Sequence, residues 1–380
     1  MTPFGGSIPS LSKSSGCFRG AEAMRAHQFV SSLSRRDAIG NHSLLLGEAL
    51  SALGVECEFY VDAPHLDRVG IAHLYTEFPN RFSAGDLVIC QIGSYSALVN
   101  FLVARRDQVI VNYHNITPAS FFEPWDPGFA RTQVEARYQL QMLAELSPLA
   151  IADSEFNARE LQELNYPHVE VLPVLFQTPS STHSSESSKQ HRAEAAYREM
   201  HHWLFVGRLL PHKAPHDLIA ALDAYVRVYG DSVMLHLVGA DYSDLYTSIL
   251  REMVARSGLE DRVIFHGSVS DEELDRLYFM SDLYVSASLH EGFCVPLLEA
   301  FSHELPVVAV SCAAVPETLG DGGILVPPGD PLAFAAAAHL LISDPDLREQ
   351  VVAAGRQRLN RSNPQQAQER LREILEGFLP

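Results

Sequence analysis

The sequence predicts an α/β protein of two doubly wound, Rossmann-like domains that face each other across a cleft. Three observations support this fold class. Short apolar segments alternate with helical segments, a Ser/Thr-rich stretch divides the alternation into halves of similar size, and 380 residues suit two domains. Short apolar strands separated by helices indicate parallel strands buried on both faces. Two such sheets joined by a linker leave a cleft between them.

The first half of the chain contains six segments with the character of buried strands. They are His27–Ser31, Glu58–Val61, Leu87–Gln91, Gln108–Tyr113, Leu149–Ala152 and Val169–Pro173. A loop of sequence SRRDAIGN and a helix through Ala52 follow the first strand, and other helical stretches separate the rest. We therefore predict a first domain at residues 25–176, preceded by a flexible leader at 1–24 that is rich in Gly, Ser and Pro.

The second half repeats the alternation after a linker. Residues 177–200 contain the run QTPSSTHSSESSKQ, which has no apolar periodicity and is typical of a linker or insertion. The strands predicted after it are 202–207, 233–239, 262–267, 282–288, 306–311 and 323–327, with a helix at 216–229. These segments predict a second domain at 201–362. The last segment, Asn363–Phe378, has the pattern of an amphipathic helix.

Composition and charge exclude several classes of protein. The chain is 47% hydrophobic and 20% charged, as expected of a globular protein, and both halves are acidic, with a net charge of −19. We expect no nucleic-acid partner, because phosphate neutralisation requires a basic surface. Five scattered cysteines without a CxxC pair, together with the absence of an apolar segment near the start, predict a cytoplasmic protein. Contact with the inner face of a membrane stays open.

The first turn with candidate chemistry is FVGRLLPHK, at the exit of strand 202–207. Gly207 opens the turn, and Arg208 and Lys213 follow it. The chain has three lysines, and Lys213 alone lies outside the predicted leader and linker. Two cations beside a turn opened by glycine suit a diphosphate. The alternative is a pair of solvated loop charges.

The second turn, SASLHEGFCVPLLEAF, leads from strand 282–288 into a helix. Gly292 permits a tight bend and Pro296 suits the start of a helix, so residues 292–295 would present backbone N–H groups to an anion. Glu299 falls in the first turn of the predicted helix, where it could simply favour the helix dipole. Glu291 precedes the bend beside a buried strand. The alternative for Glu291 is an exposed loop acid.

Three weaker candidates lie at other strand exits. In HGSVSDEEL the backbone after Gly267 could read a nucleobase edge, although SDEE also has the pattern of a helix N-cap. His114 leaves strand 108–113 and is suited to hydrogen bonding or proton exchange. In DAIGN, Gly40 lies in the first loop before a helix, where backbone could approach a phosphate. The sequence has no GxGxxG, GxxxxGK[ST] or GxSxG motif, and we predict no metal site.

Taken in order, these segments resemble the retaining glycosyltransferases of family 4. The segments are GRLLPHK, RVIFHGSVSDEEL, EGFCVPLLEA with glutamates seven residues apart, and PETLGDGGILVPPGDP. The resemblance covers about residues 25–378 and implies the glycosyltransferase B architecture, in which the last helix, within 363–380, crosses back to complete the first domain. DAIGN and YHNITP resemble the bacterial mannosyltransferases of surface-polysaccharide synthesis.

The resemblance implies a role for each matching position. Arg208 and Lys213 would bind the donor diphosphate, Glu291 the hexose hydroxyls and Glu299 the ribose hydroxyls. The remaining donor contacts would come from Gly40 and Gly207 near the diphosphate, from the backbone of Gly292, Phe293 and Cys294, from Val269 at the base, and from His114 near the 6-hydroxyl of the sugar. Cys294 departs from the family, which usually has glycine there.

The resemblance thus implies an enzyme that transfers a hexose, with mannose from GDP-mannose as the best assignment, to a glycan or lipid-linked acceptor. No metal or other cofactor is expected, and Glu291 is expected to position the sugar without bonding to it. The alternatives are a UDP- or ADP-sugar transferase, a sugar-nucleotide epimerase, a phosphorylase with pyridoxal on Lys213, and a non-catalytic sugar-nucleotide-binding protein. The acceptor residues are unknown. Phe121, Phe122 and Trp125 are candidates, with core packing as their alternative.

Overall fold

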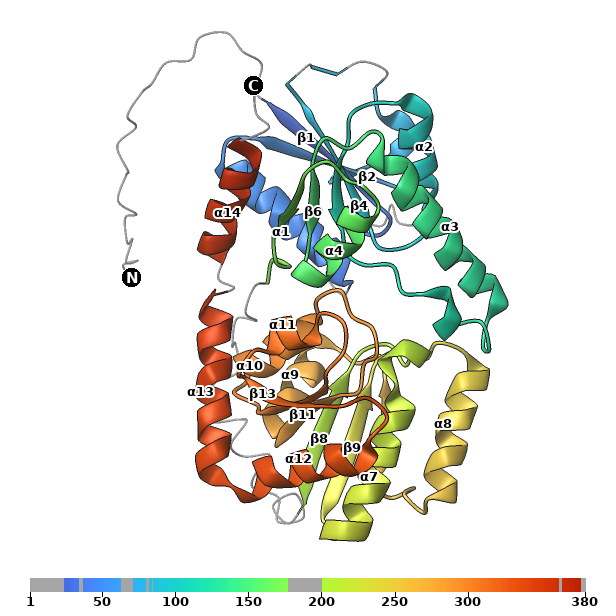
Figure 1. Ribbon diagram of the computed structural model, residues 1–380, viewed down its shortest axis with the longest axis vertical. Coiled ribbons are helices and arrows are strands. Elements are labelled where there is room, and N and C mark those ends of the chain that lie inside the picture. The colour runs from blue at the N-terminus through green and yellow to red at the C-terminus, as the bar shows by residue number, and fades with distance from the viewer. Residues whose placement is uncertain are drawn as a thin grey trace, which may run out of the picture.

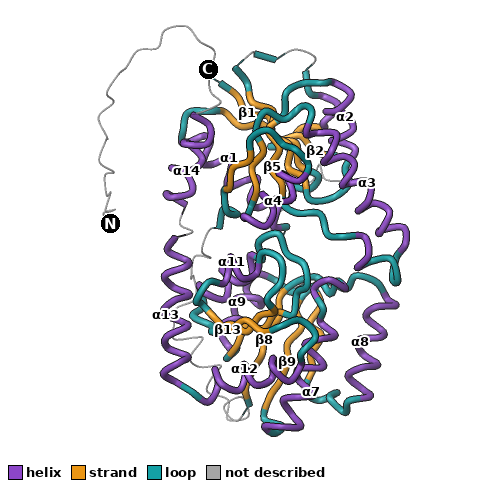
Figure 2. The backbone as a smooth tube through the Cα atoms, in the orientation of Figure 1, coloured by secondary structure: helices purple, strands orange, loops and turns teal. Residues whose placement is uncertain are grey.

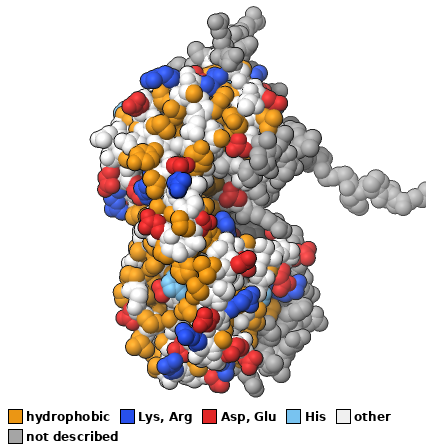
Figure 3. All heavy atoms as spheres, turned by 90° about the vertical axis from the view of Figure 1, so that its right-hand side faces the viewer, with side chains coloured by type: hydrophobic (Ala, Val, Ile, Leu, Met, Phe, Trp, Pro, Cys, Tyr) orange, Lys and Arg blue, Asp and Glu red, His pale blue; other side chains and the backbone are white. Residues whose placement is uncertain are grey.

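The computed structural model describes residues 24–33, 37–62, 71–79, 82–83, 85–176, 200–361 and 364–376. They form two α/β domains, each with one parallel sheet between layers of helices (Figure 2). This arrangement confirms the predicted class of two Rossmann-like domains. The predicted leader and linker lie outside the described residues, except for Met24 and Met200. On the face shown in Figure 3, acidic and basic side chains are interspersed.

The first sheet has the strand order β3-β2-β1-β4-β5-β6-β7 and is parallel throughout. Its strands are β1 (Arg25–Val30), β2 (Glu56–Val61), β3 (Ala72–Leu74), β4 (Leu87–Ile92), β5 (Ile110–Tyr113), β6 (Ala150–Ala152) and β7 (Val169–Val171). Six of these lie where the apolar segments predict strands. The sequence analysis missed β3, because three half-exposed residues at a sheet edge are too few to show an alternating pattern.

Helices with capped N-termini cover the first sheet. They are α1 (Ala38–Ala52), α2 (Ala97–Arg105), α3 (Pro127–Ala144) and α4 (Glu155–Glu163), with the short 3-10 helices η2 (Tyr75–Glu77) and η3 (Ala119–Phe121). Gly40 does not lie in the loop before a helix, where the sequence analysis placed it. It lies inside the first turn of α1, and its N–H donates to Asp37 Oδ2 at 3.1 Å. The Asp37 side chain accepts this bond as an N-cap, so the Gly40 amide already has a partner.

The second sheet has the order β10-β9-β8-β11-β12-β13 and is also parallel. Its strands are β8 (His201–Val206), β9 (Val233–Val238), β10 (Val263–Gly267), β11 (Leu283–Ser286), β12 (Val307–Val310) and β13 (Gly323–Val326). Its helices are η4 (Pro211–Lys213), α7 (Pro215–Tyr229), α8 (Asp244–Arg256), α9 (Asp271–Met280), α10 (Val295–Ser302), α11 (Val315–Leu319), α12 (Pro331–Ser343) and α13 (Pro345–Arg361). Ser270 caps α9 by accepting from the N–H of Glu273, as the SDEE pattern predicts.

The strand order fixes where ligands can bind. In each sheet the order reverses direction at one point, between β1 and β4 in the first and between β8 and β11 in the second. Ligands of doubly wound sheets bind outside the carboxyl ends of the strands at this point. The loops after β8 and β11 are the two that contain Arg208, Lys213 and Glu291.

The chain ends on the first domain. Helix α14 (Pro364–Glu376) packs beside α1, as Figure 1 shows for the red and blue helices. Leu371, Ile374 and Leu375 are buried in the same cluster as Leu46 and Leu50 of α1. Their apolar stripe, at helical spacing, holds α14 against the first domain.

Three histidines form a hydrogen-bonded row across adjacent strands of the second sheet. His202 Nδ1 lies 2.9 Å from His236 Nε2, and His236 Nδ1 lies 2.9 Å from His266 Nε2. Burial first, and then the neighbouring His202 and His266, lower the pKa of His236 to about 3. His236 is therefore neutral in the folded protein at neutral and mildly acidic pH.

We expect this row to make stability depend on pH. Below its ordinary pKa of about 6.5, His236 takes up a proton in the unfolded chain but not in the folded one. The free energy of unfolding should therefore fall as the pH drops from about 6.5 towards 3, by up to about 1.4 kcal/mol per pH unit for this one group. Urea denaturation at pH 7.5 and 5.5 measures the difference. A His236→Gln variant should show a smaller difference than the wild type, whereas an equal difference would contradict this assignment.

Candidate active site

The structure brings Lys213 and Glu291 together at the centre of the second domain. Lys213 ends the 3-10 helix η4 after β8, and Glu291 lies in the loop after β11, the neighbouring strand. The Lys213 Nζ atom lies 2.6 Å from Glu291 Oε1. The side chains are 22% and 8% exposed, so neither is a solvated loop charge.

The electrostatics of this pair keep Lys213 charged. Burial alone would lower the pKa of Lys213, but the Glu291 carboxylate outweighs it and raises this pKa above its usual value. The neighbouring His212 is different, because burial first and the nearby Lys213 second lower its pKa well below the usual range. Arg208 is exposed and has no hydrogen-bond or ion-pair partner within the described residues. Its guanidinium is therefore available to an anion.

The loop after β11 turns into α10 through an unusual backbone conformation. Cys294 is the N-cap of α10 with φ 74° and ψ 65°, in the left-handed region. The side chain is buried, and burial together with Glu291 raises the pKa of the thiol well above its usual range. This conformation explains why glycine suits the position, since a residue with a Cβ is strained there.

We therefore expect an inverted order of stability between two variants. Cys294→Ala and Cys294→Gly both lose the buried sulfur, but only glycine relieves the left-handed strain. The glycine variant should be more stable than the alanine variant by about 1 kcal/mol, the reverse of their order at an ordinary helix position. Chemical denaturation of the two variants measures this, and equal or opposite stabilities would rule out the strained conformation.

Glu299 lies one residue further along α10 than predicted. The helix begins at Val295, so Glu299 is in its second turn and not its first. Tyr278 donates to Glu299 Oε2 at 2.7 Å, and burial raises the pKa of the carboxyl group. One carboxylate oxygen therefore already has a protein donor.

The remaining donor-site candidates of the second domain gather around the same apolar cluster. Val269, in the loop after β10, packs against the cluster that contains Phe293 and Cys294. Gly207 directly follows β8 with φ 154°. Sequence segments more than 80 residues apart thus meet at one edge of the second sheet.

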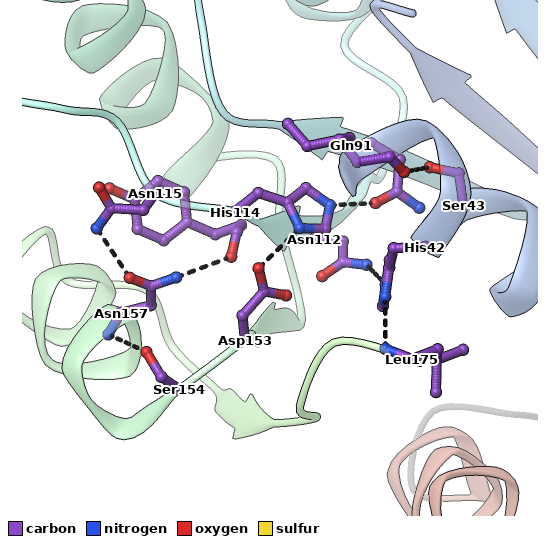
Figure 4. A network of polar contacts seen from close by, with 12 residues as sticks. His42, Ser43, Gln91, Asn112, His114, Asn115, Asp153, Ser154, Asn157 and Leu175 are labelled. Carbon is purple, nitrogen blue, oxygen red and sulfur yellow. Dashed lines mark hydrogen bonds and ion pairs between the residues drawn. The ribbon is translucent and has the colours of Figure 1, made fainter. Parts of the chain in front are cut away.

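His114 lies at the exit of β5 in the first domain, and both of its ring nitrogens have partners. Nδ1 lies 2.9 Å from Asp153 Oδ2, and Nε2 lies 2.7 Å from Gln91 Oε1 (Figure 4). Its side chain is 4% exposed. A sugar hydroxyl could therefore bind this ring only by displacing Asp153 or Gln91, which the sequence-based expectation for His114 does not foresee.

The two domains touch where these candidates lie. His290, next to Glu291, has Nε2 2.6 Å from Asn115 Oδ1 of the first domain. A Cβ on Gly292 would lie 2.6 Å from Asn115 Cβ and 2.9 Å from the carbonyl oxygen of His114. The backbone of the Glu291 loop therefore packs directly on the exit of β5, and only glycine fits at position 292.

A second contact joins the domains through a helix end. The carboxylate of Glu317, in α11, accepts from the backbone N–H of Glu155 at 2.9 and 3.0 Å. Glu155 is the first residue of α4 in the first domain, so a carboxylate of one domain caps a helix of the other. In Figure 1 the orange α11 lies directly below the green α4.

The aromatic residues after YHNITP serve mainly as domain packing. Phe122 is 1% exposed, with its ring centre 5.5 Å from that of His212, and Trp125 packs edge-on against Tyr246 at 4.8 Å. Of the two alternatives for Phe122, the structure favours core packing, because its ring is buried between the domains. Phe121 is half-buried, with its ring 6.2 Å from those of His212 and His290.

The sequence analysis missed the polar residues that surround His114. Gln28, Gln91 and Asn112 lie inside the apolar strands β1, β4 and β5, and all three are at most 3% exposed. Buried amides need hydrogen-bond partners, so an amide in the middle of an apolar strand is a detectable signal. His290 and Glu317 had no local signal, because the side-chain hydrogen bonds that identify them are made to the other domain.

Comparison with known proteins finds a family match over most of the second domain. Residues 186–358 match the family model described as glycosyl transferases group 1. The matched segment includes the loops with Arg208, Lys213 and Glu291.

Individual relatives match over a similar length. Over 155 residues, the chain is 32% identical to the O-antigen chain mannosyltransferase B of Escherichia coli, and this alignment covers 40% of this chain and 39% of that relative. It is 33% identical over 151 residues to a D-inositol 3-phosphate glycosyltransferase of Streptomyces bingchenggensis, covering 38% of this chain and 33% of that relative. The alignments thus span about two fifths or less of these relatives.

Solved structures share the complete two-domain fold. The sucrose-phosphate synthase of Thermosynechococcus elongatus superposes with a TM-score of 0.74 and 17% identity, covering 93% of this chain and 99% of that one. Anabaena Alr3699/HepE in complex with UDP and glucose superposes with a TM-score of 0.72 and 20% identity, covering 93% and 100%. At these identities the likeness establishes the fold alone.

None of the described helices is both long and apolar enough to span a lipid bilayer. Within the same part of the chain, no group of three or more His, Cys, Asp or Glu side chains could hold a metal ion.

Proposed function

We propose that this protein is a retaining glycosyltransferase of family 4 that moves a hexose from a nucleotide-sugar donor to a glycan or lipid-linked acceptor. One observation carries the proposal. The segment that matches the glycosyl transferases group 1 model contains the two loops that place Lys213 against Glu291 at the carboxyl ends of β8 and β11. GDP-mannose is our best assignment of the donor, supported by the name of the Escherichia coli relative.

The chemistry follows from the charges at these strand ends. When the bond from sugar to phosphate breaks, negative charge develops on the leaving diphosphate. The Arg208 guanidinium, the Lys213 ammonium and the N-terminus of α10 would stabilise that charge in place of a metal ion. The departing phosphate oxygen would take the proton of the acceptor hydroxyl as that hydroxyl attacks from the same face, which retains the configuration. Glu291 would hold the sugar hydroxyls, and Glu299 the ribose through its second carboxylate oxygen.

The pair of Lys213 and Glu291 suits this role better than the pyridoxal alternative. A Schiff base requires an uncharged amine, whereas Glu291 raises the pKa of Lys213 and keeps it protonated. When the donor binds, its diphosphate would share the ammonium with Glu291, whose carboxylate would then accept bonds from sugar hydroxyls. The ligand-free ion pair thus keeps both side chains in the positions that the donor requires.

An exposed apolar stripe supports a lipid-linked acceptor at the inner face of a membrane. On α3, Val134, Tyr138 and Met142 are 43%, 63% and 42% exposed and follow each other at intervals of four residues. Residues at this spacing lie on one face of a helix. Phe129 of the same helix packs against Tyr242 of the second domain, with ring centres 5.7 Å apart, and the stripe itself lies on the domain proposed to bind the acceptor.

Thermal-shift measurements with GDP, UDP, ADP and their sugar conjugates, with and without EDTA, test the proposal. GDP and GDP-mannose should stabilise the protein equally with and without EDTA, by about 2.7 kcal/mol at 100 times Kd. A response to UDP or ADP alone would replace the donor but leave the transferase. Absence of a response to every nucleotide would overturn the proposed function. Binding without transfer to any acceptor would favour the non-catalytic alternative.

A further inference from the structure

The hydrogen bonds around His114 have a direction that a backbone group sets. Gln28 Nε2 lies 3.1 Å from the carbonyl oxygen of Ser43, which can only accept. The amide nitrogen of Gln28 must therefore face Ser43, and its oxygen Oε1 must face Gln91, whose Nε2 lies 2.7 Å away. This orientation leaves Gln91 Oε1 as the atom 2.7 Å from His114 Nε2. An amide oxygen only accepts, so His114 Nε2 must carry a hydrogen.

The other ring nitrogen of His114 faces a second acceptor. Nδ1 lies 2.9 Å from Asp153 Oδ2. Asp153 is 3% exposed, and its carboxylate comes from the end of β6, beside β5 in the sheet. A hydrogen on Nδ1 satisfies this contact and pairs a cation with the buried carboxylate.

A second amide of this network, Asn112, also has an orientation that its neighbours set. The N–H of Leu175 donates to His42 Nδ1 at 3.0 Å, so a neutral His42 carries its hydrogen on Nε2. That nitrogen lies 2.9 Å from Asn112 Nδ2, which places donor against donor, while Asn112 Oδ1 and Asp153 Oδ1 are both buried without a partner. If the Asn112 amide is rotated by 180°, its oxygen faces His42 Nε2 and accepts the hydrogen there. The amide nitrogen then occupies the position of the unpartnered Oδ1. Figure 4 draws Asn112 between His42 and Asp153.

We propose that this network holds His114 as an imidazolium that positions the exit of β5 against the Glu291 loop and exchanges no proton during the reaction. The groups that face the ring are Asp153 from the end of β6, Gln91 from β4 and His42 from α1, whose ring centre lies 5.1 Å away. Burial is the larger cause that lowers the pKa of His42, and the charge of His114 is the smaller one. Of the two histidines, His42 is therefore the neutral one.

The network acts on the candidate active site through the backbone. The Glu291 loop packs at Gly292 against the carbonyl oxygen of His114. Asn115, the next residue, forms a hydrogen bond with His290 across the domain contact. Fixing the ring on both sides therefore fixes the first-domain surface on which that loop packs. His114 is a positioning residue in this scheme. Only the expected effect of this network on sugar transfer rests on the proposed function.

The test uses a residue that does not touch His114. Gln28→Met removes the amide that orients Gln91, so the Gln91 amide can turn and donate to His114 Nε2, which then loses its hydrogen. Cys57→Ala is the matched control, because Cys57 Sγ is the other neighbour of Gln28 Nε2, at 3.0 Å, and its removal leaves the Ser43 carbonyl in place. The probe is ¹⁵N-histidine NMR of the full chain, with the His114 signals assigned by their loss in His114→Gln.

Wild type and Cys57→Ala should show two protonated ring nitrogens on His114 at pH 8, and Gln28→Met should show one unprotonated nitrogen. An unprotonated nitrogen in the wild type at pH 7, or an unchanged signal in folded Gln28→Met, would overturn the inference. Neither readout depends on turnover, so a protein that binds no nucleotide would refute the proposed function and leave this result intact. With a working transfer assay, kcat of Gln28→Met should gain a dependence on pH between about 6 and 8 that Cys57→Ala lacks.

Discussion

Replacing Lys213 with methionine is expected to lower kcat at least about 100-fold, the effect of removing one preorganised charge from a developing anion. The change also leaves Glu291 buried without its cation, and breaking a buried pair in this way destabilises a protein by roughly 3–5 kcal/mol. Steady-state kinetics with the donor that thermal shift identifies, together with urea denaturation, measure both effects.

A double variant separates activity from stability. Lys213→Met combined with Glu291→Gln replaces the ion pair by two neutral side chains of similar size. Most of the lost stability should return, because no unpaired charge is left in the protein interior, while kcat should stay low. If the single variant kept its kcat within a few-fold of the wild type, Lys213 would not act on the diphosphate.

Gly292→Ala is expected to separate the domains without unfolding either of them. The added Cβ would meet Asn115 Cβ at 2.6 Å and the His114 carbonyl oxygen at 2.9 Å, and both atoms belong to the other domain. Because neither domain contains the clash within itself, each should keep its fold while the Glu291 loop moves off the first domain. A misplacement of about 1 Å can lower a rate by about 100-fold, and kcat should fall by that order.

Gly85→Ala is the matched control, since a Cβ there meets no atom within 4 Å. Small-angle scattering with and without nucleotide should show a larger radius of gyration for Gly292→Ala and an unchanged one for Gly85→Ala. Wild-type kinetics in Gly292→Ala would mean that the reacting complex uses a domain contact other than the one in this structure.

Much of the candidate site could be predicted because local sequence carries its signal. Lys213 stood out as a lysine at a strand exit in a chain with three lysines, and Glu291 as an acid before a glycine bend. The contact between their side chains could not be predicted. The two residues are 78 positions apart, and their contact depends on β8 and β11 being neighbours in the sheet. Glu299 lies just beyond the first turn because α10 begins at Val295, one residue before Pro296, and a local pattern does not fix a helix start to the residue.

The sequence by itself determined the two parallel sheets and the loops that carry the chemistry. A strand that is buried on both faces requires a run of consecutive apolar residues, and such a run can be recognised from the local sequence alone. The tertiary structure alone decided that Phe122 is buried between the domains and that both ring nitrogens of His114 have hydrogen-bond partners. The physical reason is that hydrogen-bond partners and packing neighbours are set by which strands and domains meet, and residues far apart in the chain supply them.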